Sequence, residues 1–172
     1  MAYVRTPGMS PLVSATNLAG FRGAPFPETT VESAGETVRA DCGWHIAPEV
    51  EQTVKVRTGG LDTFNLPSLY VVDVVSVVDR DGAPVTGWDF WENGVLDRAG
   101  GFPDIIKVTF RHGYQSCPKD LHGIIAERSG SQASGRVKAE SLAGRSVQLD
   151  GGYDPNTPAI LAAYRLEPGG RS

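Results

Sequence analysis

The first regular hydrophobic pattern along the chain has the spacing of a helix. Between residues 29 and 42, small and apolar residues recur on one face at helical spacing: Val31, Ala34, Gly35, Val38 and Cys42. Thr29 followed by Glu32 matches a capping box, so the helix is predicted to begin there. Gly43 follows the last apolar position and Pro48 forbids continuation, so the helix is predicted to end at Cys42.

From residue 51 to residue 114 the pattern changes to that of strands separated by turns. Short apolar or alternating segments cover Thr53–Arg57, residues 61–66, Leu69–Val78, residues 88–96 and Ile105–His112. Gly59-Gly60 predicts a turn that pairs the first two segments, and Asn93-Gly94 predicts a tight hairpin within the fourth. Consecutive strands without intervening helices favour an antiparallel meander or a small barrel.

Two more helices are expected after the strands. Ser116 or Cys117 serves as cap and Pro118 opens a helix to about residue 128, with three inward residues: Leu121, Ile124 and Ile125. The composition of Ser129–Gly135 predicts a flexible segment, and the pattern of Glu140–Leu149 is typical of an isolated strand. Thr157-Pro158 is predicted to open a short helix that ends at Leu166. The apolar stripes of helices 29–42 and 118–128 are predicted to pack together. The fold class is therefore α+β: a small helical layer, a central antiparallel β-module and a short C-terminal helix.

The chain divides by pattern into three parts. Residues 1–27 are rich in proline and glycine without a period of 2 or 3.6, so they are expected to form an extended arm that is ordered only against another surface. Residues 28–150 hold the core with its helices and strands. Residues 151–172 are expected to form a C-terminal anchor segment, set off by Gly151-Gly152.

Composition and charge exclude several classes of protein. The 172 residues carry a net charge of −4, which disfavours binding to nucleic acid by general phosphate neutralisation. The most apolar run, near Leu69–Val78, is interrupted by Asp73 and Ser76 and cannot span a bilayer. The first 14 residues lack the apolar core of a signal peptide, and two cysteines favour a reduced, cytoplasmic setting.

Motifs for catalysis are missing from the sequence. It contains no G-x-S-x-G, no Walker loop, no H-E-x-x-H and no G-x-G-x-x-G, so we expect neither an enzyme nor a cofactor. Cys42 with His45, and His112 with Cys117, leave open a Cys2His2 zinc site that would stabilise a β-module. Packing of these four side chains is the favoured interpretation, because neither half has the usual ligand spacing.

Two segments are candidates for contacts with other proteins. Trp88 and Phe90 share one face of a strand, which leaves Trp91 opposite, where an exposed tryptophan would mark a protein–protein contact. The C-terminal helix is too short to be stable alone in water, so residues 157–166 must dock either on the core of their own chain or on a partner.

A set of short segments also keeps a distinctive order over residues 28–166. They are Val38–Pro48 (VRADCGWHIAP), Leu66–Leu69 (LPSL), Asn93–Leu96 (NGVL), Val108–Tyr114 (VTFRHGY), Glu140–Val147 (ESLAGRSV) and Leu161–Leu166 (LAAYRL). No single segment is specific, but in this order they resemble the head-to-tail adaptor (connector) proteins of tailed bacteriophages. The arm at residues 1–27 is longer than the core of that family needs.

The resemblance implies a non-enzymatic structural protein of the virion, located at the neck between head and tail and assembled in the host cytoplasm. Such adaptors form a dodecameric ring under the portal protein, extend the DNA channel and provide a platform for stopper and tail proteins; the genome passes through without sequence-specific binding. The C-terminal helix of the family reaches the portal. With the exposed tryptophan, this makes six candidate partner-binding residues: Trp91, Ile160, Leu161, Tyr164, Arg165 and Leu166. The alternatives are a stopper or tail-completion ring and a zinc-stabilised module unrelated to virions.

Overall fold

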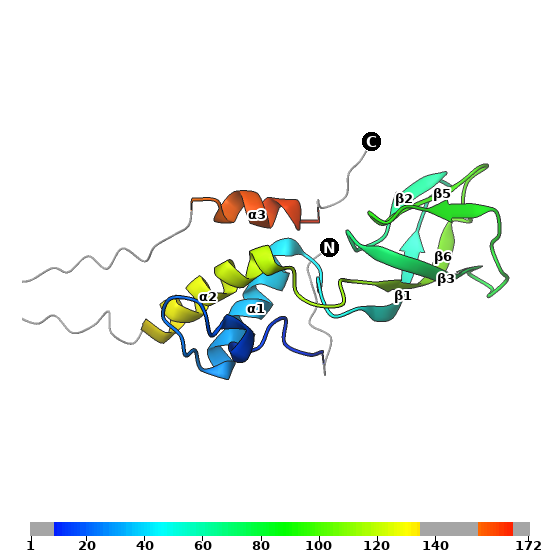
Figure 1. Cartoon of the computed structure of the whole chain (residues 1–172). Helices are drawn as coiled ribbons and strands as arrows, with labels where there is room; N and C mark the ends of the chain where they lie inside the picture. Colours follow the sequence, from blue (N-terminus) through cyan, green and yellow to red (C-terminus); the bar gives the residue numbers. More distant parts are fainter. Residues whose placement is uncertain (1–8, 135–154, 167–172) are drawn as a thin grey trace, which may run out of the picture.

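The computed structural model of the chain describes residues 9–134 and 155–166. Helices gather at one end of the molecule and two small antiparallel sheets at the other (Figure 1). Each end has a hydrophobic core of its own. The predicted α+β class, with a short C-terminal helix, is confirmed.

Helix α1 (Glu28–Cys42) agrees with the predicted helix to within one residue. Its end is as predicted, because Gly43 takes a left-handed conformation with φ of 81°. The predicted capping box is wrong: the cap is Pro27, whose side chain makes no capping hydrogen bond. The helix begins early enough that Thr29 lies inside its first turn, where Thr30 Oγ1 donates to the Pro27 carbonyl over 2.7 Å.

Helix α2 (Lys119–Ser134) packs on α1, as the two apolar stripes predict. It runs through most of Ser129–Gly135, which the sequence predicts to be flexible. Ser129 is buried, and its hydroxyl donates to the carbonyl of Ile125 one turn earlier over 2.7 Å, so its polar group is satisfied within the helix. The strand predicted at Glu140–Leu149 lies outside the described residues.

Residues 9–27 pack against α1 and α2 of the same chain. They include η1 (Ala15–Leu18), a short 3-10 helix capped by Ser14. Residues 9–27 contribute four buried side chains to the helical core: Leu12, Val13, Leu18 and Phe26. Leu12 lies so close to α1 that a Cβ on Gly35 would stand 3.2 Å from the leucine Cβ. The surface against which residues 9–27 of this arm are ordered is therefore that of the helices of the same chain.

The β-module consists of two three-stranded sheets, both antiparallel. Sheet A has the order β1-β6-β3, and sheet B has the order β2-β5-β4. The strands of sheet A are β1 (Val50–Arg57), β3 (Val71–Asp79) and β6 (Ile105–His112). Those of sheet B are β2 (Thr63–Asn65), β4 (Trp88–Phe90) and β5 (Val95–Arg98). The predicted β4–β5 hairpin at Asn93-Gly94 is confirmed.

The hairpin predicted between β1 and β2 is wrong, because these strands belong to different sheets. Gly59 and Gly60, with φ of 63° and 81°, turn the chain from sheet A into sheet B instead of reversing it within one sheet. The inner faces of the two sheets share one core, centred on Leu96, Ile106 and Phe110. The predicted meander is thus limited to β4–β5, and most pairing is long-range.

Candidate functional site

Residues 157–166 of the C-terminal segment dock on the helices of their own chain. Leu161 of α3 (Thr157–Ala163) is buried in the helical core, with Ile160, Tyr164 and Leu166 packed against it. Of the two docking partners that the sequence leaves open, the structure shows the chain's own core.

Backbone and side-chain hydrogen bonds hold residues 164–166 at the C-terminus of α1. The Trp44 Nε1–H donates to the Tyr164 carbonyl over 2.8 Å, and the Leu166 N–H donates to the Cys42 carbonyl over 2.8 Å. Arg165 is exposed, and its Nε donates to the Asp41 carbonyl over 3.2 Å. Among the five candidate residues on this segment, Leu161 is therefore a core residue, and Arg165 is the one most open to a partner.

A groove with unsatisfied polar atoms lies beside α3. Its lining comes from α1, α2 and α3 and includes Thr37, Glu127, Arg128 and Thr157. Arg128 Nη2 donates to Asp41 over 2.6 Å, but its Nη1 is buried and has no hydrogen-bond partner. The buried hydroxyl of Thr157 also lacks one. Two neighbouring polar atoms of this kind are costly in an isolated chain, and an acceptor from a bound partner would satisfy them.

Trp91 stands at the turn of the β4–β5 hairpin, beside the start of β3 in the β-module. Its side chain is 65% exposed, whereas Trp88 and Phe90 are partly buried against the core of the β-module, as the alternation predicts. The Trp91 N–H donates to the Val95 carbonyl over 2.9 Å and closes the turn. The Val71 N–H donates to the Glu92 carbonyl over 2.7 Å, so the turn is also fastened to β3.

Two further apolar side chains near this turn were missed by sequence reasoning. Val72 and Val75 are exposed on β3, which is an edge strand of sheet A. The register of β3 against β6 shifts at both positions, so each valine is the extra residue of a bulge. The signal in the sequence was the triplet repeat VVD-VVS-VVD over residues 71–79, whose period of three fits two bulges and does not fit a regular strand.

A buried arginine ties together the arm, α1 and the start of the β-module. The guanidinium of Arg39 donates from Nη1 to Glu36 Oε1 over 2.6 Å and from Nε to the His45 carbonyl over 2.9 Å. Its Nη2 donates to two carbonyls, those of Ser10 at 3.0 Å and Ala47 at 2.5 Å. Sequence reasoning missed this role, because an arginine on a helix face is ordinarily solvated.

The four candidate zinc ligands do not come together. His45 and His112 pack with ring centroids 4.4 Å apart, while Cys42 and Cys117 are free thiols in the helical core. Within residues 9–134 and 155–166, no group of three or more His, Cys, Asp or Glu could hold a metal ion. Burial raises the pKa of Cys42 to about 11 and that of Cys117 to about 12, so both thiols stay protonated and inert.

The two histidines form a neutral buried pair. His45 Nε2 lies 2.8 Å from the Pro48 carbonyl, and His112 Nε2 lies 3.0 Å from Gln52 Oε1. Burial lowers the pKa of His45, and burial together with the neighbouring His45 lowers the pKa of His112 to about 3. Neither ring is charged near neutral pH, so the pair packs as part of the junction between helices and sheets.

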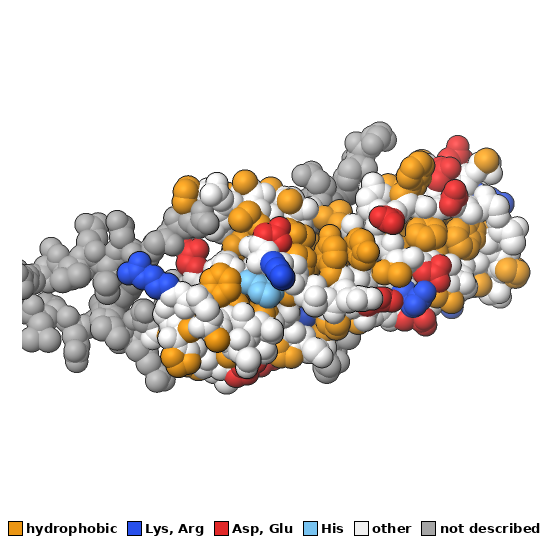
Figure 2. All heavy atoms as spheres, in the orientation of Figure 1, with side chains coloured by type: hydrophobic (Ala, Val, Ile, Leu, Met, Phe, Trp, Pro, Cys, Tyr) orange, Lys and Arg blue, Asp and Glu red, His pale blue; other side chains and the backbone are white. Residues whose placement is uncertain are grey.

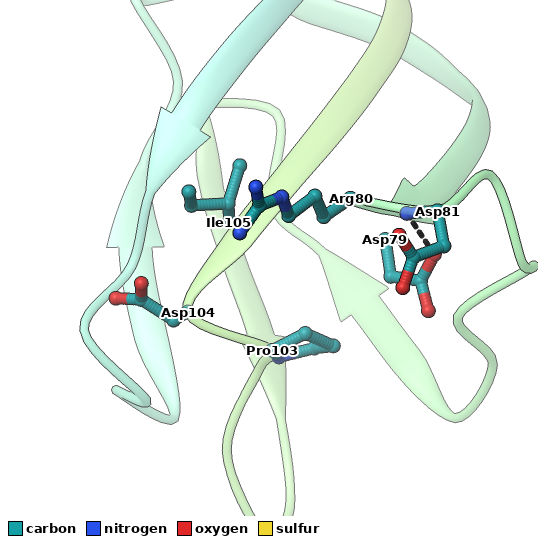
Figure 3. A pocket seen from close by; sticks show the side chains of 6 residues that line it. All are labelled: Asp79, Arg80, Asp81, Pro103, Asp104 and Ile105. Carbon is teal, nitrogen blue, oxygen red and sulfur yellow. Dashed lines mark hydrogen bonds between the residues drawn. The ribbon is translucent and has the colours of Figure 1, made fainter.

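The turn at Asp79-Arg80-Asp81 borders a shallow hollow at the end of sheet A (Figure 3). Asp79 Oδ1 accepts hydrogen bonds from the Asp81 N–H at 2.9 Å and the Ala83 N–H at 2.8 Å, so this carboxylate closes the turn. Asp104 lies across the hollow and points away from Asp79 (Figure 3). The carboxylates therefore do not converge on a common point, which agrees with a solvated turn.

Comparison with known proteins relates the chain to two solved structures. No protein-family model matches it, and no curated protein matches it. Its fold is similar to that of a chain in the neck of an empty gene transfer agent particle, computed with C6 symmetry; the TM-score is 0.59 at 16% sequence identity, over 98% of this chain and 97% of the other. A chain of the virion of the native gene transfer agent particle matches over the same shares, with a TM-score of 0.57 and 16% identity. These matches establish a shared fold along nearly the whole length.

Proposed function

We propose that this chain is a structural subunit of the neck of a virion or phage-like particle, and that within the neck it is a head-to-tail adaptor. The observation that carries the proposal is the fold match to a neck chain over nearly the full length of both chains. The short segments that resemble phage adaptors, in the order in which they follow one another along the sequence, support the finer assignment as an adaptor. In this role the protein is not an enzyme and needs no cofactor.

Two separate surfaces support a subunit that joins different partners. The helical end carries α3, the exposed Arg165 and the groove with the unpaired Arg128 Nη1 and Thr157 hydroxyl. The β-module carries Trp91, in a turn that is hydrogen-bonded to β3. We assign the helical end to the portal and the β-module to neighbouring subunits and to the stopper or tail proteins.

A ring explains how a small chain can surround a DNA channel. The matched neck was computed with C6 symmetry, and a dodecameric ring is compatible with a sixfold axis. The net charge of −4 suits a channel through which DNA passes without adhering. Within the described residues, no helix is long and apolar enough to cross a membrane. The neck of the virion is the proposed location, after assembly in the host cytoplasm.

Electron microscopy of the purified protein tests the proposal, alone and mixed with the portal or the tail proteins of its own particle. Rings of this chain stacked on the portal are the expected result. Rings that bind the tail proteins but not the portal would identify a stopper or tail-completion ring instead. If no ring forms with either partner, the proposed function is wrong. Arg165→Glu should weaken binding to the portal, and Arg22→Glu, an exposed arginine beside η1, is the matched control.

A further inference from the structure

The solvent face of sheet A holds two lysines in direct opposition. Lys55 on β1 is the register partner of Lys107 on β6, and both side chains are exposed. Like charges directly opposite each other destabilise an antiparallel pair. No described acidic side chain pairs with either lysine. We call Lys55 and Lys107 the lysine face.

Other cations on this sheet already have acidic partners. Arg111 lies 3.5 Å from Glu49 and 3.3 Å from Asp73, and Arg57 lies 3.6 Å from Asp104. The uncompensated positive charge of the sheet is therefore concentrated at the lysine face, between these two paired arginines.

The solvent face of sheet B repeats the arrangement with the opposite sign. Asp89 on β4 is the register partner of Asp97 on β5, and both side chains are exposed. Asp89 accepts a hydrogen bond from the Phe90 N–H at 2.8 Å, and Asp97 accepts one from Thr63 Oγ1 at 2.8 Å. No described lysine or arginine pairs with either carboxylate. We call Asp89 and Asp97 the aspartate face. Figure 2 shows acidic side chains on the side of the module where sheet B lies.

The two faces point in opposite directions. Side chains alternate between the faces of a strand, and the neighbours of these charged residues point into the shared core: Val54, Val56, Ile106, Val108, Phe90 and Leu96. The lysine face and the aspartate face therefore lie on opposite sides of the β-module, with that core between them. One chain cannot bring its own two faces together, but a second copy can present its aspartate face to the lysine face of the first.

We propose that neighbouring copies of this chain contact one another through these faces, lysine face to aspartate face. Each like-charge pair is then relieved by the opposite pair of the next subunit. Because the contact joins two different patches, it is heterologous and repeats from subunit to subunit, which closes a ring when the rotation per subunit allows it. The inference rests on the proposed ring and names the surface that builds it.

A charge-swap experiment tests the interface. In K55E/K107E both faces of the module are acidic, and in D89K/D97K both are basic. Each variant alone repels itself and should assemble at least tenfold more weakly than the wild type. An equimolar mixture should assemble into rings in which the two variants alternate. Each swap replaces one like-charge pair by another on an exposed face, so the fold of the monomer is kept.

Assembly is measured by native mass spectrometry and by sedimentation at low ionic strength, where screening is weak. R22E/K119E is the matched control, since it reverses two exposed cations outside the interface and should assemble like the wild type. A further variant, K55Q, removes the repulsion between Lys55 and Lys107 within one chain. It should raise the melting temperature of the monomer while weakening assembly, a combination that a merely structural lysine does not produce.

The outcomes separate this inference from the proposed function. If both swapped variants assemble alone like the wild type, or if their mixture stays monomeric, the interface is wrong. Wild-type rings on the portal, together with normal assembly of the swapped variants, overturn only the interface. A charge swap that behaves as expected in a protein that never joins portal or tail overturns only the neck function.

Discussion

Replacing Arg39 by methionine should destabilise the protein strongly, because this buried guanidinium binds four acceptors from three parts of the chain. Its partners are Glu36 within α1, the Ser10 carbonyl of the arm, and the carbonyls of His45 and Ala47 before β1. The Arg39 side chain is 0% exposed and that of Glu36 is 21% exposed, so little solvent replaces the lost contacts.

The size of the loss follows from what the methionine leaves behind. Removing one partner of a buried ion pair costs about 3–5 kcal/mol, and each buried carbonyl left without a donor costs about 1–3 kcal/mol. Methionine recovers part of this through packing, so we expect the free energy of unfolding to fall by about 4 kcal/mol. Arg39→Lys keeps the charge, but a single ammonium group cannot reach four acceptors as the planar guanidinium does. The free energy of unfolding should therefore fall by about half as much.

Urea unfolding followed by circular dichroism measures the loss, with Arg22→Met as an exposed control that should change stability by less than about 0.5 kcal/mol. Limited proteolysis adds a local reading, since the arm near Ser10 should be cut faster once Arg39 no longer holds it. A decrease below about 1 kcal/mol for Arg39→Met would refute the view that this residue joins arm, helix and β-module.

Three further results are expected. Because burial lowers the pKa of His112 to about 3 from an ordinary value of 6.5, the unfolded state takes up its proton first as pH falls. Stability present above pH 6.5 should decrease towards pH 3, by about 2 kcal/mol at pH 5, and a flat unfolding profile over that range contradicts this. Trp91→Ala should change the melting temperature little and impair ring assembly; a destabilised monomer that still forms normal rings would make Trp91 a core residue. Leu161→Ala should lower the free energy of unfolding by about 2 kcal/mol, as measured by urea unfolding. A chain ending at Asp150 should have a lower melting temperature than the full chain. An unchanged melting temperature would mean that α3 docks elsewhere.

The positions of α1 and α2 could be predicted because their signals are local, whereas the extension of α2 to Ser134 could not. A stripe of apolar residues and a glycine stop define α1 within a few turns, and α2 follows from Pro118 and its inward residues. The packing of α1 on α2 also followed, since two unpartnered apolar stripes on a small chain leave few alternatives. The exposed Trp91 could be predicted for a similar reason, because alternation along one short strand decides which side each residue faces.

Strand pairing could not be predicted in the same way. The β1–β6 ladder joins Val50 to His112, so nothing in the local pattern of β1 names its partner. The docking of α3 is equally long-range: the Leu166 N–H donates to the carbonyl of Cys42, which lies far earlier in the sequence, and the apolar residues of α3 suit either their own chain or another protein. Arg39 shows a third limit, because its acceptors are main-chain carbonyls, which sequence does not reveal.

Charge shows most clearly why the register of the strands matters for function. A net charge of −4 describes the chain as mildly acidic and hides its separation into two opposite faces. Lys55 and Lys107 lie far apart in the sequence, as part of different strands, and only the antiparallel register sets them opposite each other. Asp89 and Asp97 are close in the sequence, on the two strands of one hairpin, and the register of that hairpin sets them opposite each other. Two repulsive pairs on one small module weaken the isolated chain, so their complementary signs are best explained by a contact that the isolated chain lacks.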